Sequence, residues 1–170
     1  MTVSEIMGKI TAHMIEGLML HEQMGQYYRF LGMNGYAENH DWHYGQESIM
    51  YRFVRDYYIT HYNMLPPKVT ATNPNAIPDG WYRYKRDEVD TNTKRSAVKN
   101  GLTAWRTWEE DTKALYQKMY SELMALGEVA FASVVESIIV DTDKELADVM
   151  AYFLRHKADD YSMESIMAEQ

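Results

Sequence analysis

The sequence has no cysteine and no long apolar run. Without cysteine, the chain cannot form disulfide staples, thiolate zinc sites, iron–sulfur clusters or a thiol nucleophile. No apolar run approaches the roughly 18 residues that span a bilayer. The first 14 residues carry Glu5 and His13, where a secretory signal has an apolar core. We therefore expect a cytoplasmic protein with no membrane segment.

Familiar catalytic motifs are missing as well. The sequence holds no nucleophile elbow of the G-x-S-x-G type, no Walker loop, no dinucleotide-binding glycine fingerprint and no H-E-x-x-H. Cofactor sites built at strand ends are therefore not expected, and any chemistry has to come from side chains on helices.

Proline is confined to one window, since all 4 prolines lie between residues 66 and 78. Elsewhere apolar residues recur every three or four positions, the spacing of one helix face. The pattern predicts one all-α domain over residues 1–170, with helices over 4–33, 42–64, 93–126 and 128–157, a turn over 34–41 and a short helix or frayed tail over 158–170. The fourth helix could be interrupted, because Thr142 to Glu145 also matches a capping box.

The segment from 65 to 92 is unusually long for a connection inside a compact domain. Two antiparallel hairpins joined by a crossover along the whole bundle would explain its length, and would make helix 93–126 parallel to helix 42–64. The alternative is a flexible tether between two hairpins that pair in trans.

The formal net charge of −8 disfavours general binding to a phosphate backbone. Only the middle of the chain is basic, and residues 81–99 there combine aromatic rings with cations, as single-strand nucleic-acid binders do. These residues are Trp81, Tyr82, Arg83, Tyr84, Lys85, Arg86, Lys94, Arg95 and Lys99. The simpler interpretation is a solvated loop whose aromatic rings anchor it to the domain, and nucleic-acid contact is the weaker alternative.

Several ionisable residues lie on or beside apolar stripes of the predicted helices, the faces that are expected to form the core. An interior charge is costly unless it is paired or bound to a metal ion, so converging stripes of this kind form a candidate metal site. The residues are Glu22, Glu47, His61, Glu109, Glu136 and Asp143. Structural alternatives are ion pairs of Glu22 and Glu109 with Arg29 and Arg106, core or rim positions for His21 and His61, and a helix-capping role for His40 to His43.

Three segments resemble the ferritin-like superfamily. Residues 22–33, which read Glu-Gln-Met-Gly-Gln-Tyr-Tyr-Arg-Phe-Leu-Gly-Met, are similar to its first metal-bearing helix; residues 56–65 and 134–143 are similar to its second and fourth. The resemblance implies a ferritin-like antiparallel four-helix bundle with a long crossover between the second and third helices. It also implies iron or manganese held by Glu22, His61, Glu109 (or Glu110) and Glu136 (or Asp143).

The resemblance departs from the family pattern at the second helix. Tyr58 stands where the family has a glutamate three residues before the histidine, and no Glu-x-x-His occurs in the sequence. We therefore predict a non-catalytic ferritin-like bundle that acts by self-association, as a homo-oligomer, or by partner binding, with a degenerate metal site. The alternative is a di-metal carboxylate protein with ferroxidase-like oxidative activity that uses Glu22, His61, Glu109 and Glu136.

Overall fold

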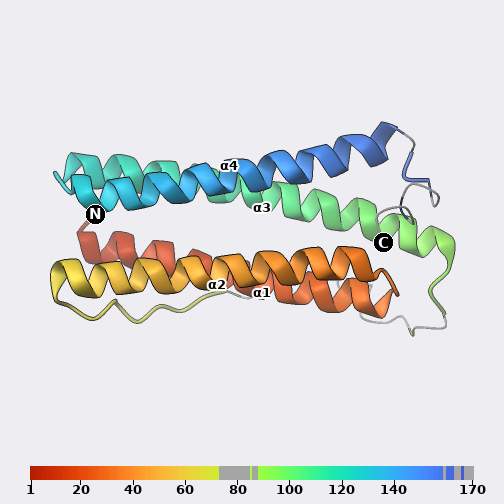
Figure 1. Ribbon diagram of the computed structural model, residues 1–170, viewed down its shortest axis with the longest axis horizontal. Helices are drawn as coiled ribbons and strands as arrows, with labels where there is room; N and C mark the ends of the chain where they lie inside the picture. Colours follow the sequence, from red (N-terminus) through yellow and green to blue (C-terminus); the bar gives the residue numbers. More distant parts are fainter. Residues whose placement is uncertain (73–84, 86–87, 159, 163–165, 167–170) are drawn as a thin grey trace.

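The computed structural model describes residues 1–72, 85, 88–158, 160–162 and 166. Its elements are four α-helices, and the predicted all-α class is confirmed (Figure 1). They are α1 (Val3–Phe30), α2 (Asn34–Tyr62), α3 (Thr91–Ala125) and α4 (Val129–Ala158). None of the helices in this described part of the chain has the length and apolar character to cross a membrane.

The helices pack as two antiparallel hairpins, α1 with α2 and α3 with α4, and α1 also contacts α3. Figure 1 shows α3 starting at the end of the molecule where α2 starts, so these two helices run in the same direction. The long connection predicted between them is confirmed. Its described beginning follows α1, where the backbone N–H and the hydroxyl of Thr72 both donate to Oε1 of Glu16.

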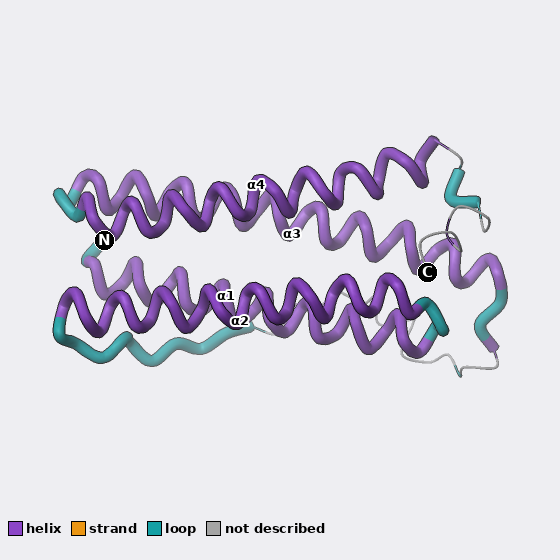
Figure 2. Tube along the Cα trace, in the orientation of Figure 1, coloured by secondary structure: helices purple, strands orange, loops and turns teal. Residues whose placement is uncertain are grey.

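A short loop closes each hairpin (Figure 2), and each loop contains a glycine in the left-handed region. Gly32 and Gly127 have φ values of 72° and 77°, a region that costs a residue with a Cβ about 1 kcal/mol or more. After each glycine the next N–H bonds back to the preceding helix: Met33 to the carbonyl of Tyr28, and Glu128 to that of Leu123. This arrangement satisfies helix-end carbonyls and lets the next helix begin at once.

One detail differs from the sequence prediction, and a second decides a point that the sequence left open. Residues 34–41 are helical, because α2 starts immediately after the Gly32 cap, and the expected turn is wrong. The second detail was left open by the sequence: α4 is continuous through Thr142. The Thr142 side chain does not cap a new helix, since its hydroxyl donates to the carbonyl of Ile138 one turn earlier in the same helix.

The interior of the bundle contains two apolar clusters. One cluster gathers around Met24, Tyr28 and Trp105, and the other around Ile10, Met119 and Phe131. Along α1 they separate between Met14 and Leu20, where Gly17 is the buried residue, and on α2, α3 and α4 the buried residues between the two clusters are polar. This break in the core positions the candidate site.

Candidate functional site

Six ionisable side chains, which we call the polar layer, lie in or next to the interval between the two apolar clusters. His21, His40, His43 and Glu109 have at most 2% of their surface exposed, while the side chains of Glu47 and Glu145 are 18% and 19% exposed. Every helix contributes at least one member. Burial of ionisable groups costs free energy of folding, so a contribution to stability does not explain why these six side chains lie in the interior.

Helical spacing brings the α2 members to one face. His40, His43 and Glu47 follow one another at intervals of three and four residues, so they line the side of α2 that meets the other helices. Gly17 of α1 lies opposite Glu47, and a Cβ at residue 17 would stand only 2.6 Å from Oε1 of that carboxylate. The absence of a side chain at Gly17 therefore makes room for the Glu47 carboxyl group.

The polar atoms of the layer form one short contact and two longer pairs. His21 Nδ1 and His40 Nδ1 share a hydrogen bond of 2.9 Å. His21 Nε2 lies 3.7 Å from Oε1 of Glu47, and His43 Nδ1 lies 3.5 Å from Oε1 of Glu145. Among the described residues, His21 Nε2, His43 Nδ1 and Glu47 Oε2 are buried and have no hydrogen-bond partner. Each leaves a lone pair or a proton that the fold does not satisfy.

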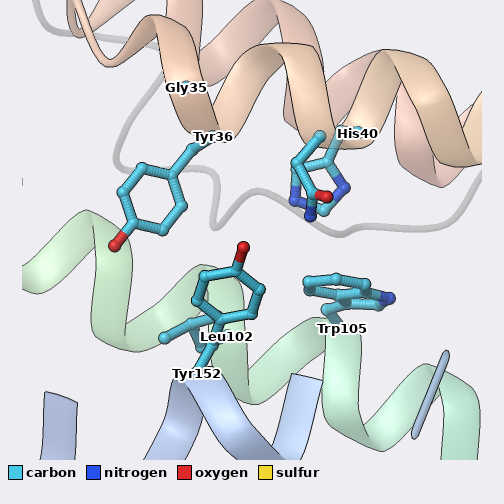
Figure 3. Close-up of a pocket in the computed structure, with 7 residues that line it drawn as sticks. Gly35, Tyr36, His40, Leu102, Trp105 and Tyr152 are labelled. Atoms are coloured by element: carbon cyan, nitrogen blue, oxygen red, sulfur yellow. The ribbon is translucent and has the colours of Figure 1, made fainter. Parts of the chain in front are cut away.

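Aromatic rings enclose the layer at one end. The ring of Trp105 lies 5.1 Å from that of His40 and 4.9 Å from that of His43, between centroids. Figure 3 shows His40 and Trp105 facing each other across a small cavity that Tyr36 and Tyr152 also line. At about 10 Å³ this cavity offers room for roughly one water molecule, so it is no ligand pocket.

Burial changes the protonation of the layer. Desolvation, and then the neighbouring Glu109 and Glu145, raise the pKa of Glu47 well above its ordinary 4.5. The pKa of Glu109 is also raised, by desolvation and by Glu145. Desolvation and neighbouring imidazoles lower the pKa of His21 well below 6.5 and that of His40 to about 3. At neutral pH these two histidines are therefore uncharged, the form in which imidazole donates a lone pair to a metal.

A groove of about 350 Å³ connects the layer with the surface. Glu47 and Glu145 line it together with apolar side chains from all four helices, and Asp141, Lys144 and Asp148 of α4 also line it. The full lining is Met14, Trp42, Gln46, Glu47, Met50, Thr112, Tyr116, Ile138, Asp141, Thr142, Lys144, Glu145 and Asp148. The layer is thus accessible from one side of the bundle.

Of the four residues predicted as metal ligands, Glu109 lies inside the bundle and Glu22, His61 and Glu136 are exposed. The inward orientation expected for Glu22 and His61 is wrong. On α1 the neighbouring residue His21 faces inward instead, and on α2 the ring of His61 stacks on that of Tyr57 at 5.2 Å.

The predicted set is also spread along the bundle. Gly17 faces Glu47 and Gly25 faces Asp41, so Glu22 lies level with the middle of that interval. His61 comes fourteen residues after Glu47 on α2, which at 1.5 Å per residue is roughly 20 Å away along the axis. The structure therefore does not bring Glu22 and His61 together.

The two arginines considered as partners of Glu22 and Glu109 contact other carboxylates. Arg29 pairs with Asp41, and Arg106 lies 3.6 Å from Glu110. His40 and His43 lie inside α2, beyond its first turn, so the capping role considered for them is wrong. The core or rim position considered for His21 agrees with its burial, but sequence reasoning missed His40, His43 and Glu145 as interior polar groups. The available signal was the i, i+3, i+7 series of His40, His43 and Glu47, which the incorrect turn over 34–41 concealed.

Residues 81–84 and 86–87 of the basic and aromatic segment 81–99 lie outside the described residues. Its described part includes Arg95, whose guanidinium donates to the backbone carbonyls of Tyr161 and Asp160. Lys99 stands over the ring of Tyr161, 5.9 Å from its centroid. These cations hold the chain that follows α4, a structural role.

These observations define a four-helix, all-α protein with a polar layer of histidines and glutamates inside it. No protein-family model matches the chain, and neither a curated protein nor a solved structure matches it.

Proposed function

We propose that the protein binds a divalent transition-metal ion in the polar layer, with donors drawn from His21, His43, Glu47, Glu109 and Glu145. The proposal keeps the metal-binding alternative of the sequence but replaces most of its ligands. The observation that carries it is the group of three buried donor atoms, His21 Nε2, His43 Nδ1 and Glu47 Oε2, that lack a hydrogen-bond partner among the described residues.

The chemistry of these donors fits a transition metal. Imidazole nitrogen combined with carboxylate oxygen suits zinc, manganese, cobalt and iron, whereas calcium and magnesium prefer oxygen alone. A cation would also relieve the electrostatic conflict among Glu47, Glu109 and Glu145, since the alternative is to keep buried carboxyls protonated.

The separations within the layer are compatible with shared coordination. Two ligands of one tetrahedral ion, each about 2.0 to 2.1 Å from the metal, stand roughly 3.4 Å apart. His43 Nδ1 to Glu145 Oε1 is 3.5 Å and His21 Nε2 to Glu47 Oε1 is 3.7 Å. Within the described residues no group of three such side chains is arranged to hold a metal ion, so binding requires Glu109 or a second pair to move in by rotamer changes.

The test is metal-dependent stabilisation with matched variants. Co(II), Mn(II), Zn(II) and Fe(II), the last without oxygen, are added to metal-free protein, and both the melting temperature and the bound metal are measured. A ligand present at 100 times its dissociation constant stabilises by about 2.7 kcal/mol, so at least one ion should raise the melting temperature by several degrees. Glu47→Gln and Glu145→Gln should abolish the increase.

Exposed glutamates supply the controls. Glu22→Gln and Glu136→Gln make the same chemical change on α1 and α4, outside the polar layer, and should leave binding intact. Circular dichroism of each variant checks that the helices are retained. A wild-type protein that none of the four ions stabilises would overturn the proposal, and so would loss of binding in Glu22→Gln with retention in Glu47→Gln.

We also propose that the protein forms a homodimer through α2, because α2 exposes an apolar stripe. Trp42, Ile49 and Phe53 are 57%, 64% and 50% exposed, and their spacing of seven and four residues puts them on one face. Gly45 and Phe53 lie four residues on either side of Ile49. A twofold axis at Ile49 would therefore set each Phe53 against the Gly45 of a second copy, a self-complementary fit of large against small.

Light scattering tests the proposed homodimer. The chain of 19.9 kDa should give a particle of about twice that mass, and Ile49→Glu should reduce it to the monomer. Val140→Glu is the control, because Val140 is 50% exposed on α4 and lies outside the stripe. A wild-type monomer at high protein concentration, or equal dissociation by both variants, would refute the proposal.

A further inference from the structure

The groove beside the polar layer has an acidic rim. Asp141 and Asp148 of α4 line the groove together with Glu145 and Glu47, and Lys144 is the one cation among the lining residues that the structure describes. Lys144 Nζ lies 2.8 Å from Oδ1 of Asp141, so its charge is already paired. The opening therefore carries a net negative charge.

The same groove leads to the donors of the layer. Glu47 and Glu145 belong to both, and Glu145 Oε1 lies 3.5 Å from Nδ1 of His43, which is 2% exposed and has no hydrogen-bond partner among the described residues. A buried donor thus faces a carboxylate that itself touches the groove. This continuity distinguishes the acidic rim from an ordinary surface cluster of aspartates.

The walls of the groove are otherwise largely apolar. Met14, Met50, Tyr116 and Ile138 line it, and apolar walls keep the local dielectric constant low. A cleft lined by charge of one sign between low-dielectric walls concentrates the opposite ion and raises its association rate by roughly 10 to 1,000 times. The effect falls steeply with ionic strength, since the Debye length shortens from about 30 Å at 0.01 M salt to about 3 Å at 1 M.

We infer that divalent metal cations enter the polar layer through this groove and that Asp141 and Asp148 attract them electrostatically. The inference rests on the proposed metal binding, and it adds the route by which the ion enters and a selectivity for positively charged species. Asp141 and Asp148 act on the rate of entry and contribute no bond to the bound ion. Cations should therefore load quickly at low salt, and anionic metal complexes slowly.

Stopped-flow loading of Co(II), followed by its visible absorbance, tests the inference. Asp141→Asn/Asp148→Asn should lower the association rate constant at least threefold in 10 mM salt and by much less in 500 mM salt. The amount of Co(II) bound at equilibrium should not change. Lys144→Gln, which leaves Asp141 without its paired cation, should raise the rate in 10 mM salt.

A second double variant controls for net charge. Glu38→Gln/Asp56→Asn also removes two negative charges, but from exposed positions of α2 that do not line the groove. This variant should bind Co(II) at nearly the wild-type rate. Gln46→Trp, a steric obstruction in the groove lining, should slow loading at both salt concentrations. Equal slowing by the two double variants, or wild-type loading in Asp141→Asn/Asp148→Asn, would overturn the inference. Wild-type protein that binds no Co(II) refutes the proposed function instead.

Discussion

The indole Nε1–H of Trp105 donates a hydrogen bond of 2.9 Å to Oε1 of Glu109, one turn further along α3. Both residues are buried, and the bond fixes one oxygen of the carboxylate in the interior of the bundle. It also lowers the pKa of Glu109, against the larger effects of desolvation and Glu145 that raise it. Trp105 therefore favours the ionised form that would bind a cation, as groups that orient metal ligands do.

Trp105→Phe should weaken metal binding at pH 7 by about 10 to 100 times, because loss of the donor raises the pKa of Glu109 further and frees its orientation. The weakening should be smaller at pH 8.5, where protons compete less. Isothermal titration with Co(II) at both pH values measures it. Trp108→Phe is the control, since the Nε1 of Trp108 has no hydrogen-bond partner among the described residues and its ring stacks on His13. Equal affinity of Trp105→Phe and wild type would contradict this role.

Glu47→Gln should stabilise the metal-free protein at alkaline pH. The folded-state pKa of Glu47 lies well above the unfolded value of 4.5, so its contribution to stability is complete below pH 4.5 and is lost as the pH rises towards the folded pKa. Gln mimics the protonated carboxyl and avoids that loss. At pH 8 we expect the variant to melt roughly 2 to 4 °C higher than wild type, for a gain of about 1 kcal/mol.

The contribution of His40 to stability depends on pH in the opposite direction to that of Glu47. Its pKa falls from 6.5 to about 3 on folding, so its contribution is present above pH 6.5 and is lost as the pH falls towards 3. Together the two groups place the broad maximum of metal-free stability between about pH 4.5 and 6.5. Calorimetry of wild type and Glu47→Gln from pH 4 to 9 measures the decline of stability on both sides of this maximum. A variant that melts below wild type at pH 8 would show that Glu47 is ionised and stabilising without metal.

Gly101→Ala should destabilise the protein although alanine is the better helix former. A Cβ on Gly101 of α3 would overlap the hydroxyl of Tyr28 and stand 2.8 Å from Cε of Met24, both on α1. The steric cost of about 1 to 3 kcal/mol exceeds the helix-propensity gain of about 1 kcal/mol. Gly8→Ala is the control, because its nearest contact would be an ordinary 3.5 Å to Pro67 and the propensity gain should remain. Urea unfolding should show opposite signs for the two variants.

Helical periodicity was enough to predict the architecture. Four helices, two hairpins and the long connection follow from apolar spacing and from the confinement of proline to one window. The start of α2 was mispredicted because residues 34–41 contain two asparagines, a glycine and an aspartate, which favour turns in isolation. The Gly32 cap and the burial of Tyr36 and Ala37 against the core override that local preference.

The candidate site was harder to predict, since a small rotation of a helix decides which of two adjacent polar residues faces inward. His21 and Glu22 are neighbours, about 100° apart around the axis of α1, and the sequence pattern favoured the wrong one. Glu109 was placed correctly because Trp105 and Thr112 mark the inner face of α3 on either side of it. The contribution of Glu145 from α4 depends on packing between the hairpins, which no local pattern encodes.

Tyr36→Phe should loosen the association of the two hairpins. The hydroxyl of Tyr36, near the start of α2, lies 2.6 Å from Nε2 of His156, near the end of α4, and both residues are buried. Loss of this bond should cost about 1 to 2 kcal/mol of unfolding free energy, and amide hydrogen exchange should rise first at these two helix ends.

Tyr57→Phe supplies the matched control. The buried hydroxyl of Tyr57 has no hydrogen-bond partner among the described residues, so its removal should be neutral or slightly stabilising. If Tyr36→Phe were as stable as Tyr57→Phe, the contact between Tyr36 and His156 would contribute nothing measurable. Ring packing would then remain as a contact between α2 and α4 at that end, since the ring centroids of Tyr36 and His156 lie 6.1 Å apart.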